Sequence, residues 1–216
     1  MQKESGIFMS PKISKELKEK RKQQILEAAE RVFIRLGYEP ATLKDIVEET
    51  GMSRGWIYLY FQTKEEIFLA LMEKFDQGNY HAINDLLQNS SKVWPVIEAL
   101  LAEQKKDFVS ISNTMTPAFY EYFLTGWRDE NRQNHLSLRF EKAIGKLVEI
   151  IQIGVEKGEF APTIPLPLLA KIIASHIEGI MVHALVVGSE KSESESQIDA
   201  LIAYIKLLLG LDRTGQ

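Results

Sequence analysis

The stretch TLKDIVEETGMSRGWIYLYFQTKEEIF, residues 42–68, decides the fold. Thr42 followed three residues later by Asp45 has the spacing of a capping box, in which the two side chains satisfy free N–H groups at a helix N-terminus. Gly51 is the residue type that most often ends a helix, because glycine adopts the left-handed conformation without a steric penalty. The first part of the stretch therefore predicts a short helix that begins after Thr42 and ends at Gly51.

Two further helices begin within the same stretch. Ser53 is expected to cap a third helix of about nine residues, whose apolar residues Ile57 and Phe61 share one face. Thr63 with Glu66 forms a second capping box, which starts a fourth helix. We expect the fourth helix to end near residue 78.

A longer helix precedes this stretch. An apolar stripe with spacings of three and four residues predicts it between residues 18 and 36: Ile25, Ala28, Ala29, Val32, Phe33 and Leu36. The apolar residues of the next two helices can converge on this stripe: Leu43, Ile46, Val47, Met52, Ile57 and Phe61. Two short helices that are joined by a glycine turn and share a core form a helix-turn-helix.

This packing leaves large side chains on the outer face of the third helix: Arg54, Trp56, Tyr58 and Tyr60, with Gly55 among them. Aromatic ring faces can meet thymine methyl groups and sugars, and Tyr hydroxyls can donate to phosphate oxygens. The N-terminus of such a helix points into the major groove of DNA. The alternative is the passive surface of a small helical bundle, and the number of exposed aromatic residues favours DNA.

The sequence ILEAAERVFIRLGYEPATLKDIVEETGMSRGWIYLYFQTKEEIF, residues 25–68, resembles the TetR family of bacterial transcriptional regulators. The resemblance rests on the threonine before the second helix, the glycine turn, the Ser-Arg-Gly opening, the Tyr-x-Tyr-Phe end and the Lys-Glu-Glu start of the fourth helix. It implies that five residues lie near the bases: Ser53, Arg54, Gly55, Trp56 and Tyr58. It also implies that Thr42, Tyr60 and Lys64 bind phosphates. Trp56 stands where the family more often has a small residue, so its base preference cannot be transferred.

The rest of the chain predicts further helices near residues 91–110, 116–128, 134–158, 165–187 and 197–210. We therefore expect an all-α protein of about nine helices. Its predicted parts are a flexible arm over residues 1–14, a helix-turn-helix domain over residues 15–66, and an effector-binding and dimerisation domain over residues 67–216. Met9 is an alternative candidate for the start of translation.

The last two predicted helices carry more apolar surface than one core requires. By resemblance they would form a four-helix interface between two subunits, with the following residues in it: Ile173, Ile177, Ile180, Ala184, Leu201 and Ile205. A twofold dimer is also what binding to two DNA half-sites requires. Burial of these residues within one subunit stays open as the alternative.

Aromatic residues are frequent between the two ends of the chain. By resemblance, this region would form a cavity for a small apolar or amphipathic effector, with Trp94, Phe123, Trp127 and Met181 as candidate lining residues. Effector binding would favour a conformation that no longer fits DNA. Ordinary core packing is the alternative for each of these residues.

Composition excludes several other classes of protein. The chain has no cysteine, which excludes thiolate metal sites and fits a cytoplasmic location. Its net charge is −4, but residues 1–24 carry seven Lys or Arg against three Asp or Glu. No signal sequence or membrane-spanning run is expected, and neither is a metal site at His176 and His183. No phosphate loop or nucleophile elbow is present, so neither a cofactor nor an enzyme activity is expected.

These observations predict a homodimeric regulator that binds double-stranded DNA at an inverted repeat. We expect a repressor that a small effector releases from its operator. Two alternatives remain: an all-helical carrier of small ligands, and a protein-interaction module that uses the exposed aromatic residues. Both would lack DNA binding at low salt.

Overall fold

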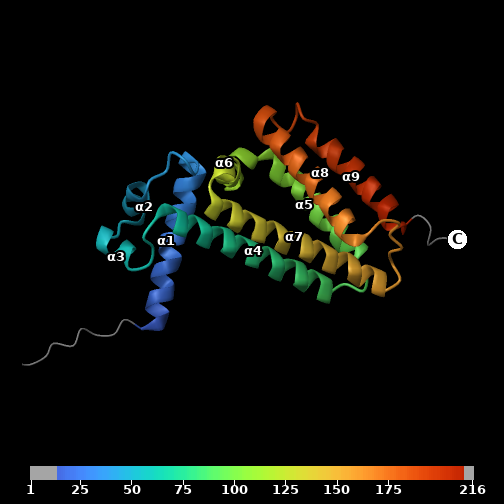
Figure 1. Ribbon diagram of the computed structural model, residues 1–216, viewed down its shortest axis with the longest axis horizontal. Coiled ribbons are helices and arrows are strands. Elements are labelled where there is room, and N and C mark those ends of the chain that lie inside the picture. Colours follow the sequence, from blue (N-terminus) through green and yellow to red (C-terminus); the bar gives the residue numbers. More distant parts are fainter. Residues whose placement is uncertain (1–13, 212–216) are drawn as a thin grey trace, which may run out of the picture.

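The computed structural model describes residues 14–211, in which nine α-helices and two short 3₁₀-helices but no strand occur (Figure 1). The elements are α1 (Lys15–Leu36), α2 (Leu43–Thr50), α3 (Arg54–Tyr58), α4 (Lys64–Gln88), α5 (Trp94–Val109), η1 (Ile111–Asn113), α6 (Thr116–Thr125), η2 (Gly126–Arg128), α7 (Glu130–Glu156), α8 (Leu166–Val187) and α9 (Ser194–Leu209). The all-α prediction is confirmed. In Figure 1, α1–α3 lie at one end, α8 and α9 lie at the other, and α4 and α7 run lengthwise between them.

The third helix is shorter than expected. Helix α3 has five residues, and its end is a tight turn in which the N–H groups of Tyr60 and Phe61 both bond to the carbonyl of Ile57. This turn directs Phe61 into the core, where it is 5% exposed. Ser53 stands at the N-cap position, but its side chain makes no capping hydrogen bond, so that part of the prediction was wrong.

The fourth helix is longer than expected, because α4 continues past residue 78 to Gln88. Gly78 disfavours a helix interior by about 1 kcal/mol relative to alanine. Beyond it, however, Ile83 and Leu87 pack against a second hydrophobic core. This tertiary packing outweighs the local preference for ending the helix.

Two cores hold the molecule together. The first joins α1–α4 with α6, and its largest buried side chains are Phe33, Tyr38, Phe68 and Tyr122. The second joins α5, α7, α8 and α9 and is mainly aliphatic. Since Ala118 and Tyr122 of α6, and Met115 just before it, belong to the first core, that core extends beyond residue 66, where the sequence placed the end of the first domain.

Helix α8 is long and apolar enough to cross a membrane when judged by length and composition alone. Helices that pack inside a protein can have the same length and composition, so this finding does not contradict the expectation of no membrane-spanning run. In the structure α8 packs along α7 on one side and α9 on another. Of the arm predicted for residues 1–14, only Ser14 lies within the described residues, and its hydroxyl accepts a hydrogen bond from Leu17 N.

Candidate functional site

Helices α2 and α3 form a compact helix-turn-helix. Thr42 Oγ1 accepts from Asp45 N at 3.2 Å, and Asp45 Oδ2 accepts from Thr42 N at 2.8 Å, so the predicted capping box is present. Gly51 ends α2 with a φ of 64°, in the left-handed region where glycine is favoured. Ile46 and Ile57 are fully buried and attach both helices to α1 and α4.

The outer face of α3 is open to solvent. Ser53, Arg54, Gly55 and Trp56 are exposed, and Trp56 keeps 37% of its surface accessible. Arg54 Nη2 donates to Tyr58 Oη at 2.9 Å, and its guanidinium lies over the same ring. The structure therefore brings together on one surface the residues predicted to lie near the bases.

Basic residues of α1 border this surface, although the sequence analysis did not place them there. The Arg21 guanidinium lies 5.6 Å from the centre of the Trp56 ring. Lys18 and Lys22 line a shallow groove together with Leu59 and Tyr60. The basic excess of residues 1–24 was the available signal, but the sequence could not show that these α1 side chains lie beside Trp56, Leu59 and Tyr60.

Lys64 has a different environment from the one expected for a phosphate ligand. Its ammonium donates to the carbonyl oxygens of Tyr38, Glu39 and Ala41 at 2.7, 2.9 and 2.9 Å. Burial lowers the pKa of Lys64. Because these bonds use all three N–H groups of the ammonium, the geometry conflicts with the predicted phosphate contact and gives Lys64 a structural role in the α1–α2 turn.

The α1–α2 turn also contacts α6. The carboxylate of Glu121 accepts from Glu39 N at 3.0 Å. It also fills the space beside Gly37, where an added Cβ would lie 2.4 Å from Glu121 Oε1. Glu121 thus connects α6 to the α1–α2 turn beside Gly37, where any larger residue would displace the Glu121 carboxylate.

Arg132 of α7 connects the same turn to α4. Its guanidinium lies 3.2 Å from Glu65 and 3.5 Å from Glu39, and its side chain is only 18% exposed. Tyr122 donates to Glu65 Oε1 at 2.8 Å. Burial raises the pKa of Tyr38, which lies beneath this guanidinium, to about 12. A polar junction therefore links the first core to the helices of the second core.

A cavity of about 370 Å³ lies in the second half of the molecule. Side chains of α4, α5, α7, α8 and α9 line it, and most of them are Ile or Leu. The polar lining residues are Asn79, Glu103, Gln104 and Asp107. Its volume lies within the range of roughly 300–1,000 Å³ that is typical of sites for small molecules.

None of the four predicted pocket residues lines this cavity. Phe123 and Trp127 are 51% and 60% exposed, while Trp94 and Met181 pack against the second core elsewhere. The lining could not be recognised from the sequence because it is mainly aliphatic, like any helical core. Gln104 was the available signal, since it lies on the apolar stripe of α5 that contains Ile97, Leu101 and Phe108.

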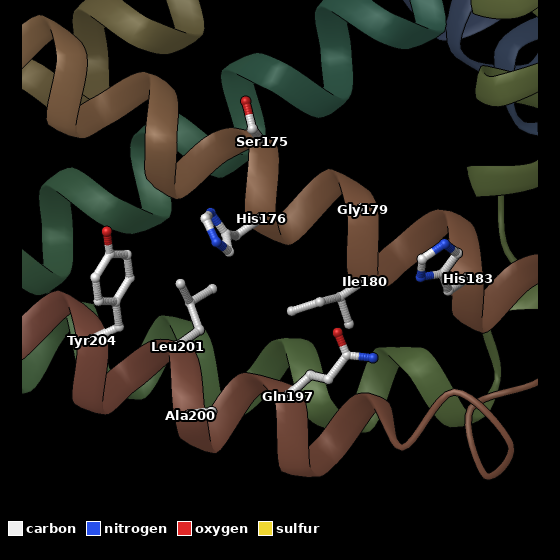
Figure 2. Close-up of a pocket in the computed structure, with 9 residues that line it drawn as sticks. All are labelled: Ser175, His176, Gly179, Ile180, His183, Gln197, Ala200, Leu201 and Tyr204. Carbon is white, nitrogen blue, oxygen red and sulfur yellow. The ribbon is translucent and has the colours of Figure 1, made fainter.

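The residues predicted for the dimer interface are largely buried within the subunit, although Ile180 and Leu201 also line a groove on its outer face. Five of them are at most 6% exposed: Ile173, Ile180, Ala184, Leu201 and Ile205. The sixth, Ile177, lines the cavity. Their burial agrees with the alternative, packing within one subunit. The outer face of α8 and α9 forms an open groove instead, in which His176, Gly179, His183, Ala200 and Tyr204 lie (Figure 2).

The two histidines of this groove lie on α8 (Figure 2). His176 Nδ1 is 2.9 Å from the carbonyl oxygen of Ile172 in the preceding turn. Among residues 14–211, no three His, Cys, Asp or Glu side chains are close enough to hold a metal ion.

Two family models match the chain. Residues 25–71 match the model for bacterial regulatory proteins of the tetR family, and residues 96–195 match a tetracyclin repressor-like C-terminal domain. The first match covers the helix-turn-helix, and the second covers most of α5–α8.

Whole-length relatives agree with these matches. The HTH-type transcriptional regulator YfiR of Bacillus subtilis is 36% identical over 204 residues, which cover 94% of this chain and 99% of the relative. The HTH-type transcriptional repressor AcnR of Corynebacterium glutamicum is 26% identical over 81% of this chain and 87% of its own. Among solved structures, GusR of Salmonella enterica superposes with a TM-score of 0.71 at 20% identity, over 92% of this chain and 98% of that one.

Proposed function

The chain belongs to the TetR family of bacterial helix-turn-helix transcriptional regulators, and on that basis we propose that it is a homodimeric repressor that a small molecule releases from DNA. It acts in the cytoplasm on an inverted-repeat operator. Ser53, Arg54, Gly55, Trp56 and Tyr58 lie near base edges in the major groove. Thr42 and Tyr60 bind phosphates.

The exposed face of α3 beside the basic start of α1 is the observation that supports this proposal most strongly. An exposed tryptophan, an arginine and a tyrosine cover one short helix, and Arg21 and Lys22 lie beside it. Lysine and arginine beside a groove-binding helix neutralise phosphates and fix its position on the duplex. We therefore replace Lys64 by Lys18, Arg21 and Lys22 as the proposed basic phosphate ligands.

Selection of duplexes from a random pool by the purified protein tests DNA recognition. We expect enrichment of an inverted repeat whose half-sites are centred about 34–36 Å apart, one turn of DNA, or a multiple of it. The Trp56→Ala variant should enrich a different base at one position in each half-site. No enrichment, together with no binding at low salt, would contradict the proposal and favour the carrier or interaction alternatives.

The proposed dimer forms through the outer groove of α8 and α9. Apolar side chains remain exposed on these helices in the single subunit, among them Leu168, Val186, Tyr204 and Leu207. At the centre of the groove, Gly179 would have open space around an added Cβ. A second subunit packed against this groove would cover these side chains and close that space.

A matched pair of glycine substitutions tests the interface. Gly179→Arg introduces a long charged side chain into the groove, whereas Gly145→Arg introduces the same residue on α7, where an added Cβ also has open space. Sedimentation should show a dimer for the parent protein and for Gly145→Arg, and a monomer for Gly179→Arg. A dimeric Gly179→Arg variant would place the interface elsewhere.

Release by an effector is proposed to act through the polar junction. A ligand in the cavity contacts α4, α5, α7 and α8, and α4 and α7 also carry Glu65 and Arg132 of the junction. A ligand shifts the equilibrium only as far as its affinities for the two conformations differ. Movement of these helices would change the separation of the two α3 helices in the dimer.

A further inference from the structure

The cavity contains a polar atom that the protein itself leaves unsatisfied. Gln104 Oε1 is buried and has no hydrogen-bond partner among residues 14–211. The side chain belongs to the cavity lining. A buried acceptor without a donor is unfavourable, so such groups are nearly always satisfied by the protein, by water or by a ligand.

The remaining lining restricts the charge of a ligand. Glu103 and Asp107 line the cavity on either side of Gln104 along α5, and the described lining includes no Lys, Arg or His. The two neighbouring lysines of α5 do not line it: Lys105 pairs with Asp199, and Lys106 pairs with Glu103. A carboxylate or phosphate beside Gln104 would therefore meet the unpaired carbonyl oxygen and the carboxylate of Asp107, while Lys106 is already paired with Glu103.

The apolar part of the lining restricts the shape of the ligand. Isoleucine and leucine side chains from five helices form the walls, and no aromatic ring is among them. Flat aromatic ligands are commonly held against aromatic side chains, which are absent from this lining. Branched aliphatic walls instead suit a flexible alkyl chain.

From these observations we infer that the cavity binds an aliphatic molecule of medium chain length whose head group is a hydrogen-bond donor without negative charge, an alcohol or an amine. The inference rests on the proposed function, because it identifies the class of effector. Gln104 Oε1 accepts the hydrogen bond from the head group. Asp107 favours a cationic amine and disfavours an acid of the same length, whereas Glu103 is already paired with Lys106.

Three probes of equal chain length test the inference: decan-1-ol, decylamine and decanoate. Their dissociation constants are measured by calorimetry, and the shift in melting temperature at equal concentration serves as the second readout. We expect decylamine and decan-1-ol to bind at least tenfold more tightly than decanoate. Equal or tighter binding of decanoate, or no binding of any probe, would overturn the inference.

Variants locate the binding site. Gln104→Met keeps the length of the side chain but removes the acceptor, and it should weaken binding of decan-1-ol at least fivefold. Gln152→Met makes the same replacement at an exposed position of α7 and should leave binding unchanged. Ile177→Trp fills part of the cavity from α8 and should weaken all three probes. Unchanged binding by Gln104→Met would assign the binding to another site and overturn the inference.

These measurements are made without DNA, so their result is independent of the proposed repressor activity. Operator binding is then measured with and without decan-1-ol. Tight probe binding without any change in operator affinity would leave the cavity chemistry intact and contradict the proposed release mechanism. Operator binding by a protein that binds none of the probes would leave the proposed function intact and contradict this inference.

Discussion

The two cores of the molecule are built from different side chains. In the first core, the ring centre of Phe68 lies 4.6 Å from the ring centre of Tyr38 and 5.0 Å from those of Phe33 and Tyr122. The second core is mainly aliphatic and borders a cavity of about 370 Å³. The packed rings join α1, α4 and α6 in the core to which Ile57 attaches α3, whereas flexible alkyl walls around a cavity can adapt to a ligand. This difference fits the two proposed functions, because a fixed surface suits DNA binding and an adaptable cavity suits an effector.

Removal of the central ring of the first core should have the largest effect. Phe68→Ala is expected to lower the free energy of unfolding by roughly 3–5 kcal/mol, because the cavity it leaves lies among packed rings. Leu147→Met, a substitution of similar volume beside the existing cavity, should cost less than about 1.5 kcal/mol. Urea denaturation of both variants measures the difference. A loss of less than about 1.5 kcal/mol for Phe68→Ala would contradict the tight packing of the first core.

Loss of Arg132 from the polar junction between the cores should have the next largest effect on stability. Arg132→Ala leaves the carboxylates of Glu39 and Glu65 without this guanidinium and should cost about 1–2 kcal/mol, since the pairs are partly solvent-exposed. Operator affinity without effector should change little, but the loss of affinity caused by a bound effector should become smaller. Arg128→Ala removes an exposed arginine near the same junction and serves as the control. Equal effector responses in both variants would contradict coupling through Arg132.

Alkaline pH should act on the first core through its buried tyrosines. The pKa of Tyr38 is raised to about 12, so the unfolded chain loses this proton first, near pH 10. The stability contributed by the neutral hydroxyl is therefore complete below pH 10 and is lost as pH rises toward 12. Tyr38→Phe should flatten the decrease in melting temperature between pH 9.5 and 11. An unchanged slope would assign the alkaline loss to other groups.

The smallest effect on stability is expected at the proposed phosphate ligands. Lys22→Ala and Lys142→Ala both remove an exposed lysine from a helix and should leave the free energy of unfolding within about 0.5 kcal/mol of the parent value. Lys22→Ala should nevertheless reduce the slope of log affinity against log salt by about 1 for each subunit. Lys142→Ala should leave this slope unchanged. Equal slopes for both variants would remove α1 from the DNA interface.

The helix-turn-helix was predictable because its signals are local. The capping box at Thr42, the glycine at position 51 and the apolar periodicity each act within a few residues. The extent of α4 beyond Gly78 was not predictable in this way, since Ile83 and Leu87 stabilise it through the second core. The end of α3 was not predictable either, because it depends on the burial of Phe61 in the first core.

The sequence by itself determined the fold class, the family and the helix whose outer face is proposed to bind DNA. These follow from spacing and residue type, which a linear sequence contains in full. Only the tertiary structure decided that Lys64 is hydrogen-bonded to three carbonyl groups, that the predicted interface residues of α8 and α9 are buried within the subunit, and that Gln104 lines the cavity. The apolar sequence pattern of a helix is the same whichever neighbour covers it. The hydrogen-bond partners of a polar side chain are set only when segments distant in the sequence come together.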